Sequence, residues 1–458
     1  MIKYIVWIIT VIFLIVFETR FSYAQDTLED RRQVPDTSIH YPYSADPNIP
    51  NDIEADLDNS FPRIGSVFGS LIPSKYFKWK TDLYDKVGLK LGASFQTMYT
   101  NVTPAITDEN ANDGWGAWVQ LEGAWKLFRK EKDWEGSINF AVDGRYKLAG
   151  DIIPGELFFE TGGQWGSDAT YLPWDLYAML LFWEQHVKYD RFWFRIGQIA
   201  SAAVLDFFRF KDPRVSFLSP ALTFPLHAIP YSAPGLGFAF KWKPIEGSGF
   251  YISGAINDLN ADAGKFDWSG LFKYGEVFAG LEFGKNWVRS RNDFDHAHLL
   301  IFYADKRSSS PLPTAAGWGV KVHGSKQWNK IVAFANYTYN TSEGGGFGIF
   351  TIAAHAATMG IVRLDPLKIQ GELGASIQMA SPIAGRADMF NQMAELNPDM
   401  ALFPGARKVP QYGAEFYWRI LMLKQFWVTP GIQFFVNPTY NISNDFMVAP
   451  HIKVRLFL

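Results

Sequence analysis

The end of the chain alternates strictly between two kinds of side chain, and this alternation limits the fold more than any other feature of the sequence. A period of two predicts a strand with one apolar face and one polar, partly basic face. Such a strand suits the closing strand of a membrane β-barrel, which pairs with the first strand so that no backbone edge is left in lipid. The two faces correspond to even and odd residue numbers, the two parities of the strand. The even parity consists of Val448, Pro450, Ile452, Val454, Leu456 and Leu458, and the odd parity consists of Ala449, His451, Lys453, Arg455 and Phe457.

The composition favours the same class. Of 458 residues, 19% are charged and 17% are aromatic, and the mean hydropathy is only -0.06. This balance is too polar for a helical membrane protein but suits a transmembrane barrel, in which half of each strand is polar. The lack of cysteine excludes disulfides and thiolate metal sites and fits a protein of the cell envelope. A net charge of -3 gives no basic field for nucleic acid.

Residues 1–24 have the pattern of a signal peptide. Lys3 supplies the positive start, residues 4–17 form an apolar run, and the small residues at 22–24 resemble a cleavage site. The run is short for a membrane-spanning helix. The alternative interpretation is an uncleaved membrane anchor.

Residues 25–80 are rich in Asp, Asn, Pro and Ser and show no sustained period. This composition predicts a polar periplasmic N-terminal arm rather than a separate enzyme domain. The alternating segments begin after it. The outer-membrane β-barrel domain is therefore expected over residues 81–458.

Alternation continues through the rest of the chain. Trp115 and Trp125 share one parity and lie ten residues apart. At ~3.3 Å per residue and a tilt near ~40°, that spacing projects to roughly 25 Å, the height of a barrel's apolar band. The sequence therefore predicts an all-β fold, a transmembrane antiparallel β-barrel of about 16 strands. The strands are expected near 86–100, 114–128, 134–147, 175–188, 191–199, 234–244, 249–257, 274–285, 296–306, 316–326, 330–340, 354–364, 367–380, 410–422, 425–437 and 446–458.

Short and long connections alternate along the chain. Outer-membrane barrels have short periplasmic turns and longer extracellular loops, so this alternation indicates which end of the barrel faces which side. Residues 286–295 fit least well because they are long for a periplasmic turn, and 175–188 is the weakest strand because apolar runs interrupt its pattern. Short links fall at 129–133, 189–190, 245–248, 327–329, 365–366 and 422–424, and long links at 148–174, 200–233, 258–273 and 381–409.

The longest connection, residues 200–233, is the predicted constriction loop. Sixteen strands leave a wide bore, so selectivity depends on what narrows it. The prolines of this loop stiffen it, and guanidinium groups beside aromatic rings can donate hydrogen bonds to sugar hydroxyls. The alternative is a loop that folds outward with its charges in water. The residues expected at the constriction are Asp206, Phe208, Arg209, Lys211 and Arg214.

Charged residues on the polar parity of neighbouring strands form a second group of candidates. Opposed acidic and basic walls create a transverse field that favours dipolar or neutral polar solutes. The alternative is that each of these residues only solvates the inner wall. The members of this group are Glu122, Asp143, Arg145, Arg195 and Lys241.

Catalytic signatures are missing from the sequence. It contains no Gly-x-Ser-x-Gly elbow, no His-Glu-x-x-His pair and no Walker lysine loop. The glycines at 344–348 lack the strand–helix context of a phosphate loop, and His296 and His298 have no further ligand at a metal-binding spacing. We therefore expect a protein that is not an enzyme and that uses neither a cofactor nor a metal.

Several segments carry a more specific signal. They are Pro230-Tyr231-Ser232-Ala233-Pro234-Gly235-Leu236-Gly237, Glu415-Phe416-Tyr417-Trp418-Arg419-Ile420, Trp427-Val428-Thr429-Pro430 and Gln433-Phe434-Phe435-Val436-Asn437-Pro438. With the register from about residue 80 onward, they resemble the carbohydrate-selective porin family, the OprB-like porins. The resemblance implies a 16-stranded outer-membrane barrel that passes monosaccharides, typically glucose, by facilitated diffusion, with arginines at a loop-built constriction. Two features depart from the family pattern: Leu458 stands where such barrels usually end in Phe, and the arm is long, proline-rich and acidic.

The predicted function is that of an outer-membrane porin of a Gram-negative bacterium, which allows passive or facilitated diffusion of carbohydrates and similar small polar solutes. The expected partners are outer-membrane lipid and small carbohydrates. A water-filled pore is also expected to pass ions. Assembly into a homo-oligomer is possible on this interpretation but is not predicted by the sequence. A general or anion-leaning diffusion porin is one alternative. A plugged barrel that acts as an adhesin or scaffold is another.

Overall fold

The computed structural model describes residues 74–458 apart from short gaps in the chain. Residues 1–73, which include the predicted signal peptide and most of the predicted arm, lie outside the described part. The gaps fall at 105–111, 131–133, 151, 164–170, 173, 189–190, 207, 224, 263, 291–292, 345–352, 369–370, 397–402, 424–425 and 458.

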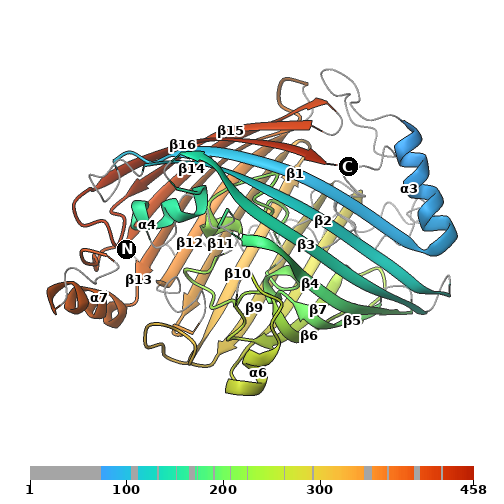
Figure 1. Cartoon of the computed structure of the whole chain (residues 1–458), viewed down its shortest axis with the longest axis horizontal. Helices are drawn as coiled ribbons and strands as arrows, with labels where there is room; N and C mark the ends of the chain where they lie inside the picture. Colours follow the sequence, from blue (N-terminus) through green and yellow to red (C-terminus); the bar gives the residue numbers. More distant parts are fainter. Residues whose placement is uncertain are drawn as a thin grey trace, which may run out of the picture.

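Strands form in each of the sixteen places that the alternation predicts (Figure 1). The segment judged weakest, at 175–188, is a continuous strand without helix. The strands of the described chain are β1 Leu89–Asn101, β2 Asp113–Lys130, β3 Trp134–Gly150, β4 Trp174–Val187, β5 Phe192–Ile199, β6 Gly235–Trp242, β7 Phe250–Asp258, β8 Val277–Ser290, β9 Asp293–Ala304, β10 Gly317–Trp328, β11 Ile331–Asn340, β12 Ala353–Leu364, β13 Gly371–Pro382, β14 Gln411–Leu423, β15 Phe426–Val436 and β16 Phe446–Phe457.

Each strand pairs antiparallel with its sequence neighbours, and β1 pairs with β16 to close the barrel. The closing seam runs from Ser94 opposite Phe457 to Thr100 opposite His451. No strand of the described sheet is left at an edge, since every strand has two partners. This confirms the closed antiparallel barrel that the last strand predicted.

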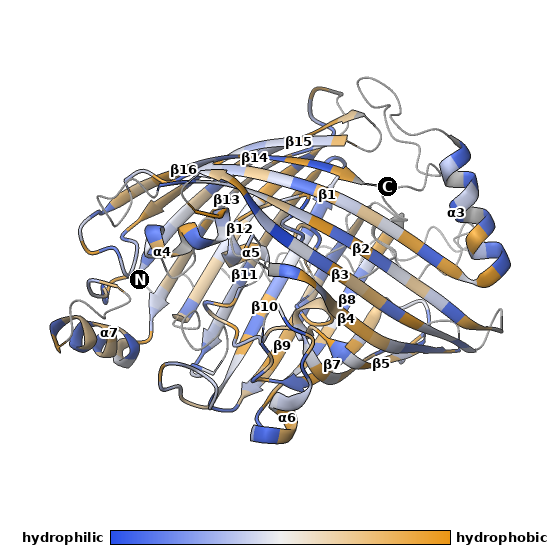
Figure 2. Ribbon diagram, viewed as in Figure 1, coloured by the Kyte–Doolittle hydropathy of each residue, from blue (hydrophilic) through white to orange (hydrophobic). Residues whose placement is uncertain are grey.

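The two parities of the strands face opposite sides of the barrel wall. In β16, Ile452 points outward and is 43% exposed, whereas Lys453 and Arg455 point inward and are buried. Hydropathy alternates in the same way along other strands (Figure 2), and outward tryptophans such as Trp115 and Trp125 are exposed. The barrel therefore has an apolar exterior and a polar inner wall.

The lengths of the connections confirm the predicted alternation. Connections after even-numbered strands are short, and those after odd-numbered strands are longer. The poorly fitting segment 286–295 is explained because β8 continues to Ser290 and β9 begins at Asp293, so the link between them is residues 291–292. Both strands are longer than their alternation indicated, since Asn286 and His296 pair across the sheet.

The helices of the described chain are short and lie in the connections or before β1. Among the described residues, no helix is both long enough and apolar enough to cross a bilayer. Helix α3 lies across the boundary predicted between residues 80 and 81. The helices are α3 Ser74–Val87, α4 Leu157–Thr161, α5 Pro220–Thr223, α6 Ser269–Tyr274 and α7 Ala384–Leu396, with 3-10 turns η2 Pro154–Glu156, η3 Ser201–Ala203 and η5 Pro366–Lys368.

Candidate functional site: a loop folded into the barrel

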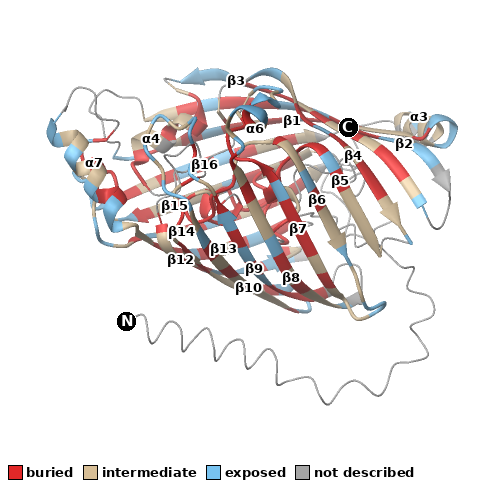
Figure 3. Cartoon of the chain, turned by 90° about the horizontal axis from the view of Figure 1, so that it is seen from below, coloured by how far each residue is buried: buried red, intermediate tan, exposed pale blue. Residues whose placement is uncertain are grey.

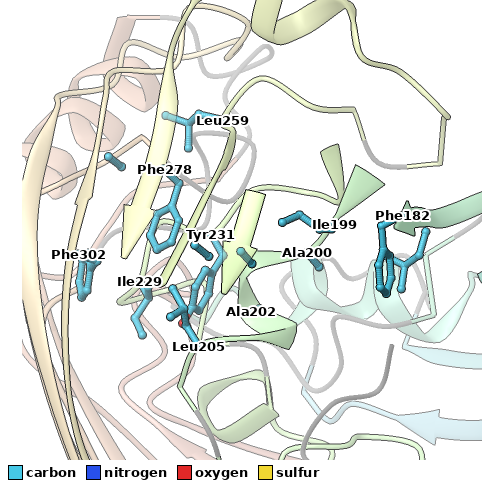
Figure 4. Packing of buried hydrophobic residues seen from close by; sticks show 14 of the residues in the cluster. Phe182, Ile199, Ala200, Ala202, Leu205, Ile229, Tyr231, Leu259, Phe278 and Phe302 are labelled. Carbon is cyan, nitrogen blue, oxygen red and sulfur yellow. The ribbon is translucent and has the colours of Figure 1, made fainter. Parts of the chain in front are cut away.

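The connection between β5 and β6, loop 200–233, folds into the barrel rather than outward. Nearly all its described residues are buried. Figure 3 shows buried chain, in red, within the ring of strands. Its two ends pack on the wall, where Leu205, Ile229 and Tyr231 gather near Phe278 and Phe302 (Figure 4). The ring of Tyr231 lies 5.0 Å from that of Phe278. The outward-folding alternative is therefore wrong for this loop.

Asp206 fixes the first turn of the loop. Its backbone is left-handed, with φ of 60°, a conformation that Asp and Asn tolerate better than most residues. Its carboxylate lies 2.6 Å from Lys321 Nζ on β10 and 3.3 Å from His298 Nε2 on β9, and its N–H donates to Glu282 on β8. Burial favours the neutral carboxyl, but Lys321, Lys211 and His298 together outweigh this and lower the pKa of Asp206.

The next three predicted residues hold the loop to itself and to β10 and β11. The ammonium of Lys211 donates to the carbonyl oxygens of Ala202, at 2.5 Å, and Leu205, at 3.1 Å. Arg209 donates to Gln327 Oε1 at 2.6 Å. The ring of Phe208 packs 4.7 Å from that of Phe334 on β11 and 5.2 Å from that of His323 on β10.

Arg214 ties the middle of the loop to β2. Its guanidinium forms a two-pronged contact with Asp212, at 3.0 and 2.9 Å, and reaches Gln120 at 2.5 Å and Glu122 at 3.0 Å. All four side chains are buried. Burial opposes ionisation of Asp212, yet Arg214 dominates and lowers the pKa of that carboxyl.

The second half of the loop is held by carboxylates on the far strands. Glu415 on β14 accepts the N–H groups of Leu218, at 2.6 Å, and Ser219, at 2.8 Å. Glu372 on β13 accepts the hydroxyl of Ser216 at 3.0 Å, and Lys453 on β16 donates to the Ser216 carbonyl at 2.7 Å. The loop thus has polar contacts with β2, β8, β10, β13, β14 and β16, on widely separated parts of the wall.

A second polar group lines β1, β2 and β3. Arg145 bonds Asp143 at 2.9 Å, and its guanidinium lies 4.1 Å from the ring centroid of Trp118. The register places Gln96, Trp118 and Arg145 in one row and Gln120 and Asp143 in the next. Within the part of the chain that is described, the buried atoms here without a hydrogen-bond partner include Gln96 Oε1, Trp118 Nε1, Gln120 Nε2, Glu122 Oε2 and Asp143 Oδ1.

The other two predicted wall residues lie apart from this group. Arg195 on β5 donates to Glu184 on β4 at 2.5 Å and stacks 4.6 Å from the ring of Trp193. Lys241 on β6 lies 4.1 Å from the ring of Tyr251. The structure therefore brings Glu122 to the loop and joins Arg145 with Asp143, whereas Arg195 and Lys241 form separate contacts.

Sequence reasoning missed most of the groups that hold the loop. The inward parity of Glu282, Glu372 and Glu415 was readable, but their loop partners are backbone N–H groups and hydroxyls far away in sequence. Trp118 was also missed, because in sequence it adjoins outward aromatic positions. In the described residues, no group of three or more His, Asp or Glu side chains is arranged to hold a metal ion.

The closed barrel of sixteen antiparallel strands with a loop folded inside it is the porin fold. The structure of OprB from Pseudomonas putida at high pH is similar over 86% of this chain and 99% of that chain, with a TM-score of 0.64 and 12% sequence identity. This similarity confirms, for the fold, the resemblance predicted from the sequence.

Other solved structures match less well. OprB from Pseudomonas putida at low pH gives a TM-score of 0.49 at 9% identity, covering 86% of this chain and 100% of that one. A loop-deletion mutant of OmpT, an outer-membrane protein of Vibrio cholerae, gives 0.45 at 10% identity, covering 81% and 99%. No family model matches the chain, and no curated protein matches it.

Proposed function

We propose that this protein is a porin of the outer membrane of a Gram-negative bacterium and that it passes small carbohydrates and similar polar solutes by diffusion. The observation that carries this proposal is loop 200–233, held across the inside of a closed barrel by contacts with β2, β8, β10, β13, β14 and β16. Asp206, Phe208, Arg209, Lys211 and Arg214 build the constriction by fixing the path of this loop.

The exterior supports insertion in a membrane. Trp115 and Trp125 on β2, and Trp318 and Trp328 on β10, are outward-facing pairs spaced ten residues apart. Each pair spans roughly 25 Å along the barrel axis, which matches two aromatic girdles around an apolar band. The longer loops then face outside the cell, and the short links face the periplasm.

Ile452→Arg tests this placement. Ile452 is central in β16, so a cation there is expected to cost about 2–4 kcal/mol of the free energy of folding into lipid, whereas Val436→Arg at the end of β15 costs about 0–1 kcal/mol. Guanidinium titrations in phospholipid vesicles measure both values. Equal costs at the two positions would place the outer face in water.

The inner wall favours neutral polar solutes. Several of the described lumen charges are paired with an opposite charge, as in Arg145 with Asp143, Arg195 with Glu184, and Arg419 with Glu372 at 2.8 Å. Paired charges leave little excess field to select an ion of one sign. Trp118 and the partnerless polar atoms of β1–β3 form part of this wall, and the buried ring of Trp118 packs 4.1 Å from the guanidinium of Arg145 and 6.1 Å from the ring of Tyr171. This argues against the anion-leaning alternative.

Liposome swelling tests the solute preference. Wild-type protein is expected to admit glucose faster than glutamate or arginine of similar size. Trp118→Ala removes the ring on which Arg145 stacks, and it is expected to reduce the preference for glucose about two- to tenfold, the equivalent of about 0.5–1.5 kcal/mol. Trp318→Ala, at an outward ring of the same type, serves as the control and leaves it unchanged. Equal rates for all three solutes would reject a carbohydrate preference.

A plugged barrel is the second candidate, because nearly every described residue of loop 200–233 is buried. Single-channel conductance separates the two functions. A porin gives stable open steps in planar bilayers, whereas an adhesin or scaffold with a filled interior passes little current. Since no catalytic motif is present in the sequence, transport rather than catalysis is the function proposed.

A further inference from the structure

Helix α3 precedes β1 and lies at the end of the barrel opposite α7, close to the C-terminus (Figure 1). Its axis runs across the strands rather than along them, so it extends along the rim. Under the orientation proposed above, this is the periplasmic rim. The helix is not used by the constriction or by the inner wall.

One side of α3 is an apolar ridge made of Tyr76, Trp79, Leu83 and Val87. The spacings of three, four and four residues place these side chains on one face of a helix. Trp79 is 51% exposed and Val87 is 52% exposed. Exposed apolar side chains of this size are unfavourable in water, so a ridge of them indicates a surface that is covered in the membrane.

The ridge is continuous with the outward face of the barrel. The indole N–H of Trp125, an outward residue of β2, donates to the carbonyl oxygen of Val87 at 3.1 Å. A different side of α3 meets the barrel, since the ring of Tyr84 lies under Lys90 at 4.9 Å and Lys126 at 5.7 Å. The exposed ridge residues Trp79 and Val87 therefore lie on a surface that continues the outward face around Trp125.

Charge on α3 favours anionic headgroups. Its four lysines outnumber its two aspartates, and Lys75, Lys78 and Lys86 are exposed. Long lysine side chains can cover apolar surface with their methylene groups while the ammonium reaches a phosphate. Amphipathic helices with lysines beside an apolar face lie in the plane of a membrane interface.

We propose that α3 is an interfacial helix that binds anionic phospholipid of the periplasmic leaflet. The ridge enters the boundary between headgroups and acyl chains, and the exposed lysines contact the phosphate groups. The helix thereby fixes the start of the barrel to the leaflet. This inference rests on the membrane insertion of the proposed function but not on the identity of the solute.

Nitroxide labelling of the full chain tests the placement of the ridge. The protein has no cysteine, so Trp79→Cys and Asp85→Cys each carry one label without background. Asp85 lies two residues from both Leu83 and Val87 and so faces away from the ridge. In vesicles of phosphatidylethanolamine and phosphatidylglycerol, the label at position 79 is expected to be reached by oxygen rather than by a water-soluble nickel complex, and the label at 85 the reverse. Equal access of the nickel complex at both positions would overturn the proposal.

The headgroup contact has its own test. Lys75→Gln, Lys78→Gln and Lys86→Gln combined are expected to abolish the shift that phosphatidylglycerol, compared with phosphatidylcholine, produces in the spectrum of the label at 79. A shift that is unchanged in this triple variant would overturn the role of the lysines. The same conclusion would follow if the wild-type protein sedimented with purified peptidoglycan and the triple variant did not, because the lysines would then bind the cell wall rather than lipid. A gel shift of unheated protein reports barrel folding separately, so failure of the barrel is distinguished from failure of α3 to bind lipid.

Discussion

Arg214→Ala is expected to detach the middle of loop 200–233 from the barrel wall while the barrel stays folded. The change removes one guanidinium from between two buried carboxylates, Asp212 and Glu122, and leaves Gln120 without its donor. Removing one partner of a buried ion pair costs about 3–5 kcal/mol because the remaining charge is left uncompensated. The barrel strands keep all their backbone hydrogen bonds, so the loss falls on the loop.

Hydrogen exchange and conductance measure this release. Backbone amides near Arg214 are expected to exchange roughly a hundredfold faster than in wild-type protein. Single-channel conductance should rise, and the preference for glucose in liposome swelling should fall. Lys408→Ala is the matched control, because Lys408 pairs with Asp388 in the connection between β13 and β14, where both side chains are more than half exposed. An exposed pair contributes about 0–1 kcal/mol, so this variant should resemble the wild type.

Unchanged exchange, conductance and swelling in Arg214→Ala would contradict the role of Arg214 in fixing the loop. Loss of the gel shift of unheated protein would have a different meaning, namely that the loop is needed for the barrel to form. The control variant also separates the removal of a charge from the removal of an anchor.

The barrel was predictable because the features that define it can be read from short stretches of neighbouring residues. A period of two identifies each strand, and the alternating lengths of the links order the strands around a closed wall. Ile452 and Lys453 show how direct this is, since adjacent residues of opposite character lie on opposite sides of one strand. The positions at which strands end were harder to predict. At the end of β8, for example, backbone pairing continues to Ser290 although the alternation of apolar and polar residues weakens near the rim.

The contacts of loop 200–233 were not predictable in the same way. That Glu415 faces inward follows from its parity, but that it accepts the amides of Leu218 and Ser219 depends on how a loop almost two hundred residues away is folded. The sequence indicated that arginines of this loop matter, and the structure places Arg209 and Arg214 in buried contacts with the wall. Parity assigns a side chain to a face, whereas its partner is decided by tertiary packing.

Asp206→Asn is expected to release the first turn of the same loop. Asparagine keeps the shape of the side chain and tolerates the left-handed backbone, so the change tests charge alone. It leaves Lys321 buried without its carboxylate, at a cost of about 3–5 kcal/mol. Lys321→Met should also cost stability, because it removes the nearest cation of Asp206 and leaves only Lys211 and His298 to compensate the carboxylate. The double variant should cost less than the sum of the two, because no unpaired charge remains between these positions.

The pH dependence of this anchor has a definite sign. Against the effect of burial, Lys321, Lys211 and His298 together hold the pKa of Asp206 below its ordinary value. The stability from its ionisation is therefore present above about pH 4, the unfolded pKa, and is lost as pH falls through the lower folded pKa. Between pH 5 and 9 the Asp206 contact should therefore contribute a constant free energy to loop 200–233. Hydrogen exchange of residues 203–206, corrected for the intrinsic pH dependence of exchange, measures this, and it should loosen only in more acidic solution. If the amides near Asp206 lost protection between pH 5 and 8 in the wild type but not in Asp206→Asn, the carboxylate would be titrating in that range, and the anchor described here would be wrong.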